Sequence, residues 1–148
     1  MGKRLPLLKI MPEVYRLYTE LDTIIKKTDI NPLYFELIKI RASQLNGCAY
    51  CLNMHGTDAI KLGEAPGRIY VLSAWREALD WFNEEEQAIL QLTEEITQIG
   101  AHGISDEVYE RVVSLFGEEK AAHLIMAAIN INSWNRIGVG LSMHPVKQ

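Results

Sequence analysis

The sequence predicts an all-α protein, a compact bundle of about six to seven helices in one domain that spans residues 1–148. Three observations support this. Apolar residues recur at three- and four-residue spacing along most of the chain, which is the period of a helix face and not of a strand. Helix start and stop signals divide the chain at short intervals. The length is close to the commonest size of a single domain, and no low-complexity segment or linker interrupts it.

The first three helices are expected between residues 12 and 63. Pro12 suits the first turn of a helix that runs to about residue 25. Asn31-Pro32 is a second start signal, an N-cap followed by a proline, and Asn46-Gly47 ends that helix. A third helix then carries both cysteines of the chain and ends at Gly63, a C-terminal cap.

Four more helices are expected after residue 65. Pro66 opens a segment that runs to about residue 79. Asn83 caps the next, with acidic residues in its first turn where the helix dipole favours them. Ser105 opens a helix that closes at Gly117, and the last begins directly after it and passes residue 134. Its segment HLIMAAINI is apolar on much of its circumference, which predicts burial inside the domain or in a subunit interface.

Composition narrows the possible partners. The net charge is −4 and no dense basic run occurs, so nucleic acid is not an expected partner. No apolar run reaches the roughly 18 residues that span a bilayer, so a membrane is not expected either. The first residues hold too short an apolar stretch for a signal peptide, and we therefore expect a cytoplasmic protein. In that compartment two closely spaced cysteines more often serve catalysis or metal binding than a structural bridge.

Cys48, Cys51 and His55 form the most informative motif. Residues three and four apart are neighbours on a helix, so the three side chains share one stripe. A first helical turn presents free N–H groups and positive potential, which favour a thiolate. The motif therefore supplies a nucleophile, a second thiol to resolve its oxidised form, and a general base.

The motif allows three other interpretations. Both cysteines could be inert core residues, although their spacing and His55 argue against this. Cys48, Cys51, His55 and Glu36 could bind zinc, but structural zinc sites usually combine two separated ligand pairs. Covalent haem attachment needs a histidine directly after the second cysteine, where Leu52 stands. We expect no metal and no cofactor.

Glu36 has two possible roles. The sequence pattern alone favours a surface acid that pairs with Lys39 or with nearby chain. A buried carboxylate close to a thiol would instead have a raised pKa and could relay protons. Several other residues are expected to be structural: His102 as an exposed loop residue, His123 as a satisfied core or interface residue, His144 on a terminal tail, Arg41 in an ion pair, and Trp134 mainly in packing.

The segment from Glu36 through Arg41 and on to SQLNGCAYCLNMH at Ser43–His55 resembles the alkylhydroperoxidase D-like branch of the carboxymuconolactone decarboxylase family. The thirteen residues from Ser43 to His55 are its specific part. Looser matches are WREA at Trp75–Ala78, LTEEIT near Thr93, and NSWNR at Asn132–Arg136. Together they cover most of the chain from about residue 31 to residue 136.

The resemblance implies an alkylhydroperoxidase D-like helical fold, assembly as trimers or hexamers, and thiol-dependent reduction of hydroperoxides. Cys51 is then the cysteine that attacks the peroxide, and Cys48 the one that resolves it. Glu36, twelve residues before Cys48, and His55 belong to a proton relay that works through Cys48 and a water. The implied partners are a small hydroperoxide and an external dithiol reductant.

One position departs from the better-studied members, which can carry a histidine between the two cysteines. Tyr50 stands there in this chain, and a phenol does not titrate near neutral pH. Two other functions stay open. One is a decarboxylase or lactone-processing enzyme of the same family, against which the two retained cysteines argue. The other is a non-catalytic, redox-sensing helical oligomer.

Overall fold

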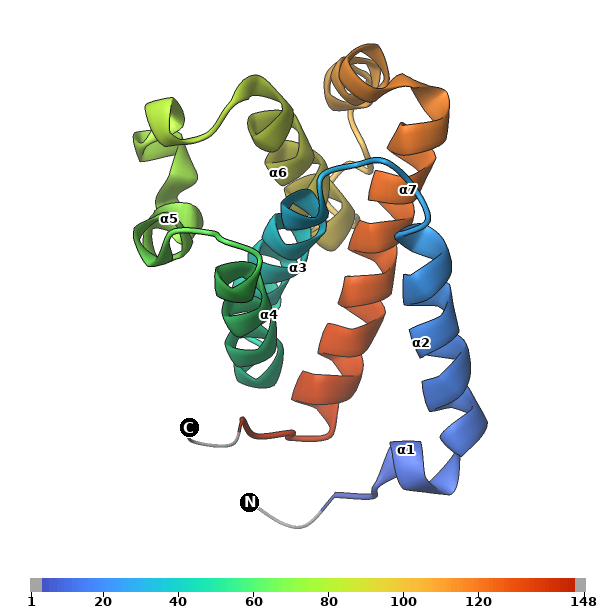
Figure 1. Ribbon diagram of the computed structural model, residues 1–148. Helices are drawn as coiled ribbons and strands as arrows, with labels where there is room; N and C mark the ends of the chain where they lie inside the picture. The colour runs from blue at the N-terminus through green and yellow to red at the C-terminus, as the bar shows by residue number, and fades with distance from the viewer. Residues whose placement is uncertain (1–3, 146–148) are drawn as a thin grey trace.

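The computed structural model describes residues 4–145, and this part of the chain contains helices and no β-strand (Figure 1). The all-α prediction is therefore confirmed. The helices in chain order are α1 (Leu7–Ile10), α2 (Pro12–Ile25), α3 (Pro32–Asn46), α4 (Ala49–Lys61), α5 (Pro66–Val71), the 3-10 helices η1 (Leu72–Glu77) and η2 (Leu79–Trp81), α6 (Glu84–Thr97) and α7 (Asp106–Gly140).

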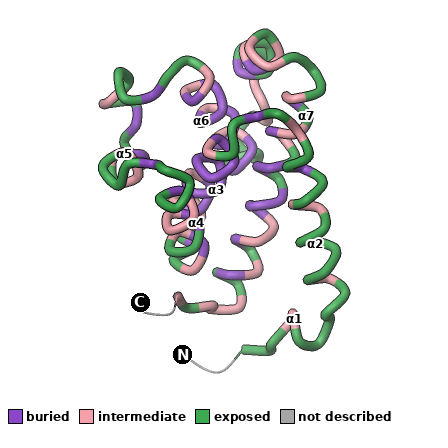
Figure 2. Tube along the Cα trace, viewed as in Figure 1, coloured by how far each residue is buried: buried purple, intermediate pink, exposed green. Residues whose placement is uncertain are grey.

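Helix α3 lies at the centre of the molecule. It packs against α4, α6 and α7, and the buried residues concentrate on these helices (Figure 2). Leu37 and Ile38 on α3 are completely buried, as are Leu90 on α6 and Leu124 on α7. By contrast, α2 lies along α7 at the surface, and Ile25 is its buried residue. A helix surrounded on all sides by other helices can hold polar side chains away from water, which matters for the site below.

Local capping signals set the boundaries of α3 and α4. The side chain of Asn31 accepts a hydrogen bond from Leu33 N at 3.0 Å, and Pro32 follows at the first helical position. Gly47 ends α3 with φ 68°, a left-handed conformation that glycine adopts without strain. The predicted boundaries of α3 are therefore confirmed. Helix α4 begins directly afterwards and ends at Lys61, two residues before the expected cap at Gly63.

The segment from Pro66 to Trp81 differs from the single helix that we expected. It breaks into α5, η1 and η2, and Ala74 has the non-helical angles φ −122° and ψ 32°. Side-chain contacts with distant elements fix this shape. Trp75 Nε1 donates to Glu94 Oε1 at 2.8 Å, and the Arg68 guanidinium contacts Glu64, Glu86 and the carbonyl oxygen of Trp81. Tertiary contacts therefore override the helical pattern here.

The last two helices follow their predicted start signals. Asn83 and Glu86 form a capping box at the start of α6. The Ser105 side chain accepts from Val108 N and begins α7. Gly117, with φ 78° and ψ 163°, bends α7 where one helix was expected to end and the next to begin. After this bend α7 runs past α3 and α2, with Leu124, Ala128 and Ile131 buried.

The histidines outside the motif lie where the sequence predicted. His102 is exposed in the loop before α7, and His144 is exposed in the C-terminal segment. His123 is half-buried, and its Nδ1 is 2.6 Å from the carbonyl oxygen of Ile25 at the end of α2. The expectation about a signal peptide falls partly on residues 1–3, which lie outside the described residues. In the described part of the chain, no helix is long and apolar enough to cross a membrane.

Candidate active site

Cys48 and Cys51 are joined by a disulfide at the start of α4. Cys48 is the N-cap of this helix, and its Sγ accepts a hydrogen bond from Cys51 N at 3.4 Å. The two Cα atoms are 5.4 Å apart, a normal separation for a disulfide. Both side chains are buried, with exposed fractions of 2% and 3%. The left-handed turn at Gly47 brings the chain from the end of α3 into this position.

Gly138 on α7 makes room for the two sulfur atoms. A Cβ atom at this position would lie 2.9 Å from Cys48 Sγ and 3.7 Å from Cys51 Sγ. A separation under 3.0 Å is a clash, so the close approach of α7 to the disulfide requires a glycine. Gly138 was not among the site residues predicted from the sequence. Its one local signal was a glycine within an apolar helical pattern, which often marks close packing.

His55 and Glu36 form a buried pair beside the cysteines. His55 Nδ1 lies 2.8 Å from Glu36 Oε2, and both residues are more than nine-tenths buried. An ionised carboxylate can only accept hydrogen bonds, so the proton of the neutral imidazole sits on Nδ1. This leaves Nε2 as the nitrogen that can take up a proton. Glu36 comes from α3 and His55 from the second turn of α4, which packs against it.

The surface-acid interpretation of Glu36 is wrong, because its exposed fraction is 4%. The raised pKa that we expected for a buried Glu36 is wrong as well. Burial raises the pKa of this carboxyl, but the hydrogen bond with His55 and the charges of two nearby lysines outweigh it, and the pKa lies below its ordinary value. Glu36 Oε1 is 3.6 Å from Lys26 Nζ and 4.0 Å from Lys39 Nζ. Glu36 is therefore held as a carboxylate.

Lys39 extends the pair into a chain of alternating charges. It is buried, and its Nζ lies 2.7 Å from Asp22 Oδ1 on α2. Burial lowers the pKa of the Lys39 ammonium, and the nearby carboxylates of Asp22 and Glu36 raise it. The effect of burial is larger, so the pKa lies below its ordinary value. Burial raises the pKa of Asp22, but Lys39 and Lys26 bring it below its ordinary value. Asp22 and Lys26 were not predicted as site residues, since only the packing of α2 brings them close to α3.

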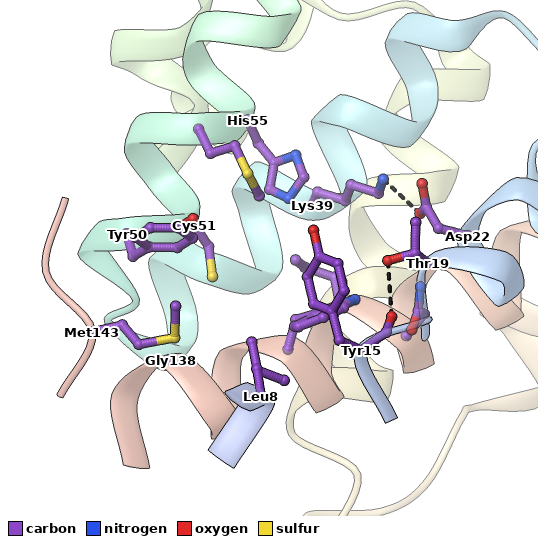
Figure 3. Close-up of a pocket in the computed structure, with 14 residues that line it drawn as sticks. Leu8, Tyr15, Thr19, Asp22, Lys39, Tyr50, Cys51, His55, Gly138 and Met143 are labelled. Carbon is purple, nitrogen blue, oxygen red and sulfur yellow. Dashed lines mark hydrogen bonds and ion pairs between the residues drawn. The ribbon is translucent and has the colours of Figure 1, made fainter. Parts of the chain in front are cut away.

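A cavity of about 210 Å³ opens beside these groups, between α1, α2, α4 and α7 (Figure 3). Its walls are mainly apolar. The residues that line it are Leu8, Tyr15, Thr19, Asp22, Lys39, Tyr50, Cys51, Met54, His55, Asn130, Ile131, Trp134, Gly138 and Met143. Cys51 belongs to this lining and Cys48 does not, so the two sulfur atoms have unequal access to a bound molecule.

The NSWNR segment of α7 connects the site to α3. Asn46 donates to Asn132 Oδ1 and to Asn135 Oδ1, each at 2.9 Å. Asn135 donates to Ser43 Oγ at 2.9 Å. Trp134 lies between these asparagines along the chain and packs edge-to-face against Tyr15 and Tyr18 of α2. It therefore serves both packing and the cavity wall.

Comparisons with known proteins agree with this picture. A sequence model described as the carboxymuconolactone decarboxylase family matches residues 12–95, more than half of the chain. The chain belongs to the carboxymuconolactone decarboxylase family. The uncharacterized protein YdfG of Bacillus subtilis (strain 168) is 43% identical over 141 residues, which are 95% of each chain.

Solved structures extend the comparison to the fold. One is a protein of unknown function from Agrobacterium tumefaciens, provisionally described as the antioxidant defence protein AhpD. It is 32% identical with a TM-score of 0.91, over 99% of this chain and 100% of that one. An uncharacterized peroxidase-related protein from Silicibacter sp. TM1040 shares the fold, with a TM-score of 0.79 at 21% identity over 88% of this chain and 69% of that one. The predicted resemblance is confirmed.

The part matched by the carboxymuconolactone decarboxylase family model holds all four predicted site residues, but not α7. Glu36, Cys48, Cys51 and His55 do lie together in the structure. Gly138 falls outside the matched range, as does the rest of the cavity wall that α7 contributes. Arg41 forms its expected ion pair, with Nε 2.8 Å from Glu94 Oε1, away from the cavity.

The residues that could hold a metal differ from the zinc set considered above. Cys48 and Cys51 cannot act as thiolate ligands while their sulfur atoms are bonded to each other in the disulfide. Ligand atoms of Glu36, His55 and Asp58 lie within 4.8 Å of one another. Both oxygens of Glu36 already face partners, and the two ammonium groups beside it oppose a further cation. The cluster fits a hydrogen-bonded acid–base pair better than a metal centre.

Proposed function

We propose that this protein is a thiol-dependent hydroperoxide reductase that uses Cys51 and Cys48 as a redox pair. The observation that carries the proposal is the arrangement around Cys51. Its sulfur reaches the cavity, its disulfide partner is in place, and His55 lines the same cavity with one nitrogen held by Glu36. The nucleophile and the proton acceptor therefore border one binding space, and the resolving cysteine is the disulfide partner of the nucleophile.

The first half of the reaction takes place in the reduced protein. His55 Nε2 accepts the proton of the Cys51 thiol, and the charged imidazolium is stabilised by the Glu36 carboxylate. The Cys51 thiolate attacks the terminal oxygen of the hydroperoxide. A sulfur–oxygen bond forms as the oxygen–oxygen bond breaks, which leaves a sulfenic acid and an alkoxide. The alkoxide takes the proton back from His55 and leaves as an alcohol.

The second half restores the thiols. The Cys48 thiolate attacks the sulfenic sulfur of Cys51, a disulfide forms, and hydroxide leaves with a proton as water. In the disulfide the two Cα atoms are 5.4 Å apart, which lies in the usual range for this bond. An external dithiol then reduces the disulfide by exchange and is itself oxidised to a disulfide. The overall reaction converts one hydroperoxide and one dithiol to an alcohol, water and a disulfide.

The charges behind His55 support the proton transfer. A carboxylate with a lowered pKa stays ionised and keeps the Nδ1 proton in place, so the imidazole presents the same nitrogen in each cycle. The ammonium group of Lys39 in turn forms ion pairs with the carboxylates of Glu36 and Asp22. In this proposal His55 acts directly on Cys51, whereas the family resemblance implied a relay through Cys48 and a water. Tyr50 is part of the cavity wall.

We further propose that the enzyme works in the cytoplasm as a homo-oligomer. Exposed apolar side chains support an oligomer: Ile99, Met126 and Ile129 have exposed fractions of 52%, 37% and 43%. Ile99 and Ile129 line one groove between the end of α6 and α7. Sedimentation of the purified protein tests this, and a monomer at micromolar concentration contradicts it.

Steady-state turnover tests the activity itself. Reduced protein is mixed with cumene hydroperoxide and dithiothreitol, and loss of the peroxide is followed with time. The wild type should consume it catalytically, Cys51→Ser should not, and Arg41→Lys, which alters an ion pair away from the cavity, should keep the activity. Consumption by Cys51→Ser at the wild-type rate contradicts the proposal. A disulfide that forms once without turnover favours the redox-sensing alternative.

A further inference from the structure

The end of α7 returns the chain to the redox pair. Ser142 has the left-handed φ of 55°, and its N–H donates to the carbonyl oxygen of Val139 at 3.2 Å. The N–H of Met143 donates to the carbonyl oxygen of Gly138 at 2.8 Å. These are the two hydrogen bonds of a Schellman cap, in which an apolar residue after the left-handed position often packs on the last helical turn. Met143 is thereby held against Gly138, the glycine beside both sulfur atoms.

The side chain of Met143 faces the cavity. It lines the same space as Cys51, and Figure 3 shows it extending from the C-terminal segment toward Cys51 and Tyr50. Met143 is partly buried. Met11 and Met126 lie outside this lining and are more exposed, with exposed fractions of 49% and 37%. Exposure alone would therefore make Met143 less reactive than these two methionines toward an oxidant in solution.

A methionine thioether stays reactive when the cysteines are oxidised. Once the disulfide has formed, Cys51 presents no thiolate, and it must be reduced before it can attack again. A thioether sulfur carries no proton and remains open to oxidation in either state of the cysteines. A second hydroperoxide in the cavity then meets the sulfur atoms of Met143 and Met54. Met54 has an exposed fraction of 39%, so its oxidation does not distinguish the cavity from bulk solvent, whereas that of Met143 does.

We infer that Met143 is a second oxidation site of the cavity, to which an organic hydroperoxide that enters the disulfide-bonded protein transfers one oxygen atom. This inference rests on the proposed function, because it requires that a hydroperoxide bind beside Cys51. The thioether sulfur attacks the terminal oxygen, and a sulfur–oxygen bond forms as the oxygen–oxygen bond breaks. The proton on the transferred oxygen passes to the alkoxide, so the products are an alcohol and methionine sulfoxide. The modification adds a polar oxygen to the apolar wall next to Cys51.

Peptide mapping tests this inference within one sample, because trypsin places Met11, Met126 and Met143 on different peptides. The disulfide-bonded wild type is incubated with excess cumene hydroperoxide, and the sulfoxide in each peptide is measured with time. Met143 should be oxidised about tenfold faster than Met126, because binding in the cavity raises the local concentration of the hydroperoxide. In protein unfolded by urea the cavity is lost, and the three methionines should react at equal rates.

Reduced wild type separates the inference from the function on which it rests. One equivalent of cumene hydroperoxide should convert its two thiols to the disulfide and leave Met143 unmodified, because a thiolate reacts with peroxide faster than a thioether. Thiols that persist contradict the proposed function. In the disulfide-bonded protein, oxidation of Met143 no faster than that of Met126 overturns the inference and leaves the thiol chemistry intact. A preference for Met143 that persists in urea overturns it as well, because the cavity would not be its cause.

Discussion

Replacing Gly138 by alanine places a methyl group 2.9 Å from Cys48 Sγ and 3.7 Å from Cys51 Sγ. Ordinary contacts between such atoms lie at about 3.5–4.0 Å, so α7 or the disulfide must move by about 0.5–1 Å. Cys48 cannot move freely, because it is the N-cap that joins α3 to α4 and its sulfur also accepts from Cys51 N. Overpacking of this kind costs about 1–3 kcal/mol.

Gly140→Ala is the matched control. Gly140 is the last residue of the same helix, and no atom would lie within 4 Å of an added Cβ. Both substitutions gain up to about 1 kcal/mol from the higher helix propensity of alanine, so their difference isolates the clash at Gly138. Gly138→Ala should therefore be less stable than Gly140→Ala by about 1–3 kcal/mol, which is about 3–9 °C in Tm for a chain of this length.

Thermal unfolding followed by circular dichroism measures the difference in stability. The displaced Cys48 sulfur should also slow disulfide formation, so a trap for sulfenic acid should label Gly138→Ala more strongly than Gly140→Ala after one equivalent of hydroperoxide. Equal Tm values and equal labelling in the two variants refute the claim that α7 packs directly on the redox pair.

Three more predictions concern the charges and the caps. The pKa of Glu36 is lowered from its ordinary value of 4.5, so its stabilising contribution is fully present above pH 4.5 and is lost as the pH falls through the lower folded value. Glu36→Gln should thus lose less stability than the wild type in acid unfolding, and parallel curves contradict this. Lys39→Met removes the buried ammonium that pairs with Asp22 and lies near Glu36, while Lys26 stays beside both carboxylates, and it should cost about 3 kcal/mol in urea unfolding. A loss within 0.5 kcal/mol, about the size of an ordinary surface substitution, would show that the Lys39 ion pairs do not stabilise the fold. Asn83→Ala removes the capping box of α6 and should cost about 1 kcal/mol by the same measurement, whereas no change means that the cap is dispensable.

The parts of the fold that local signals define could be predicted. Asn31-Pro32, Asn46-Gly47 and Asn83 act on the backbone within a few residues of themselves, so the sequence locates the helix ends directly. The segment from Pro66 to Trp81 could not be predicted in this way. Its shape depends on the hydrogen bond from Trp75 to Glu94, and a side chain nineteen positions away leaves no periodic signal.

The same distinction applies to the site. Cys48, Cys51 and His55 lie within one short segment, and helical periodicity places them together. Glu36 came from the family resemblance. The expected direction of its pKa shift was wrong because the hydrogen bond with His55 and the charges of Lys39 and Lys26 outweigh the effect of burial on the pKa.

The role of Gly138 could not be predicted from the glycine in an apolar pattern, since only the packing of α7 on α4 brings it to the two sulfur atoms. That one domain spans all of residues 1–148 stays a prediction. The homo-oligomeric state and the use of an external dithiol as reductant are proposals.

The unequal roles of the two cysteines are the central claim, and trapping of the sulfenic acid tests it most directly. Reduced Cys48→Ser protein is treated with one equivalent of cumene hydroperoxide in the presence of dimedone, and the modified residue is located by tandem mass spectrometry. The cavity geometry predicts a dimedone adduct on Cys51, with no adduct when the same treatment is applied to Cys51→Ser. An adduct on Cys48 in Cys51→Ser, with none on Cys51 in Cys48→Ser, would contradict the account.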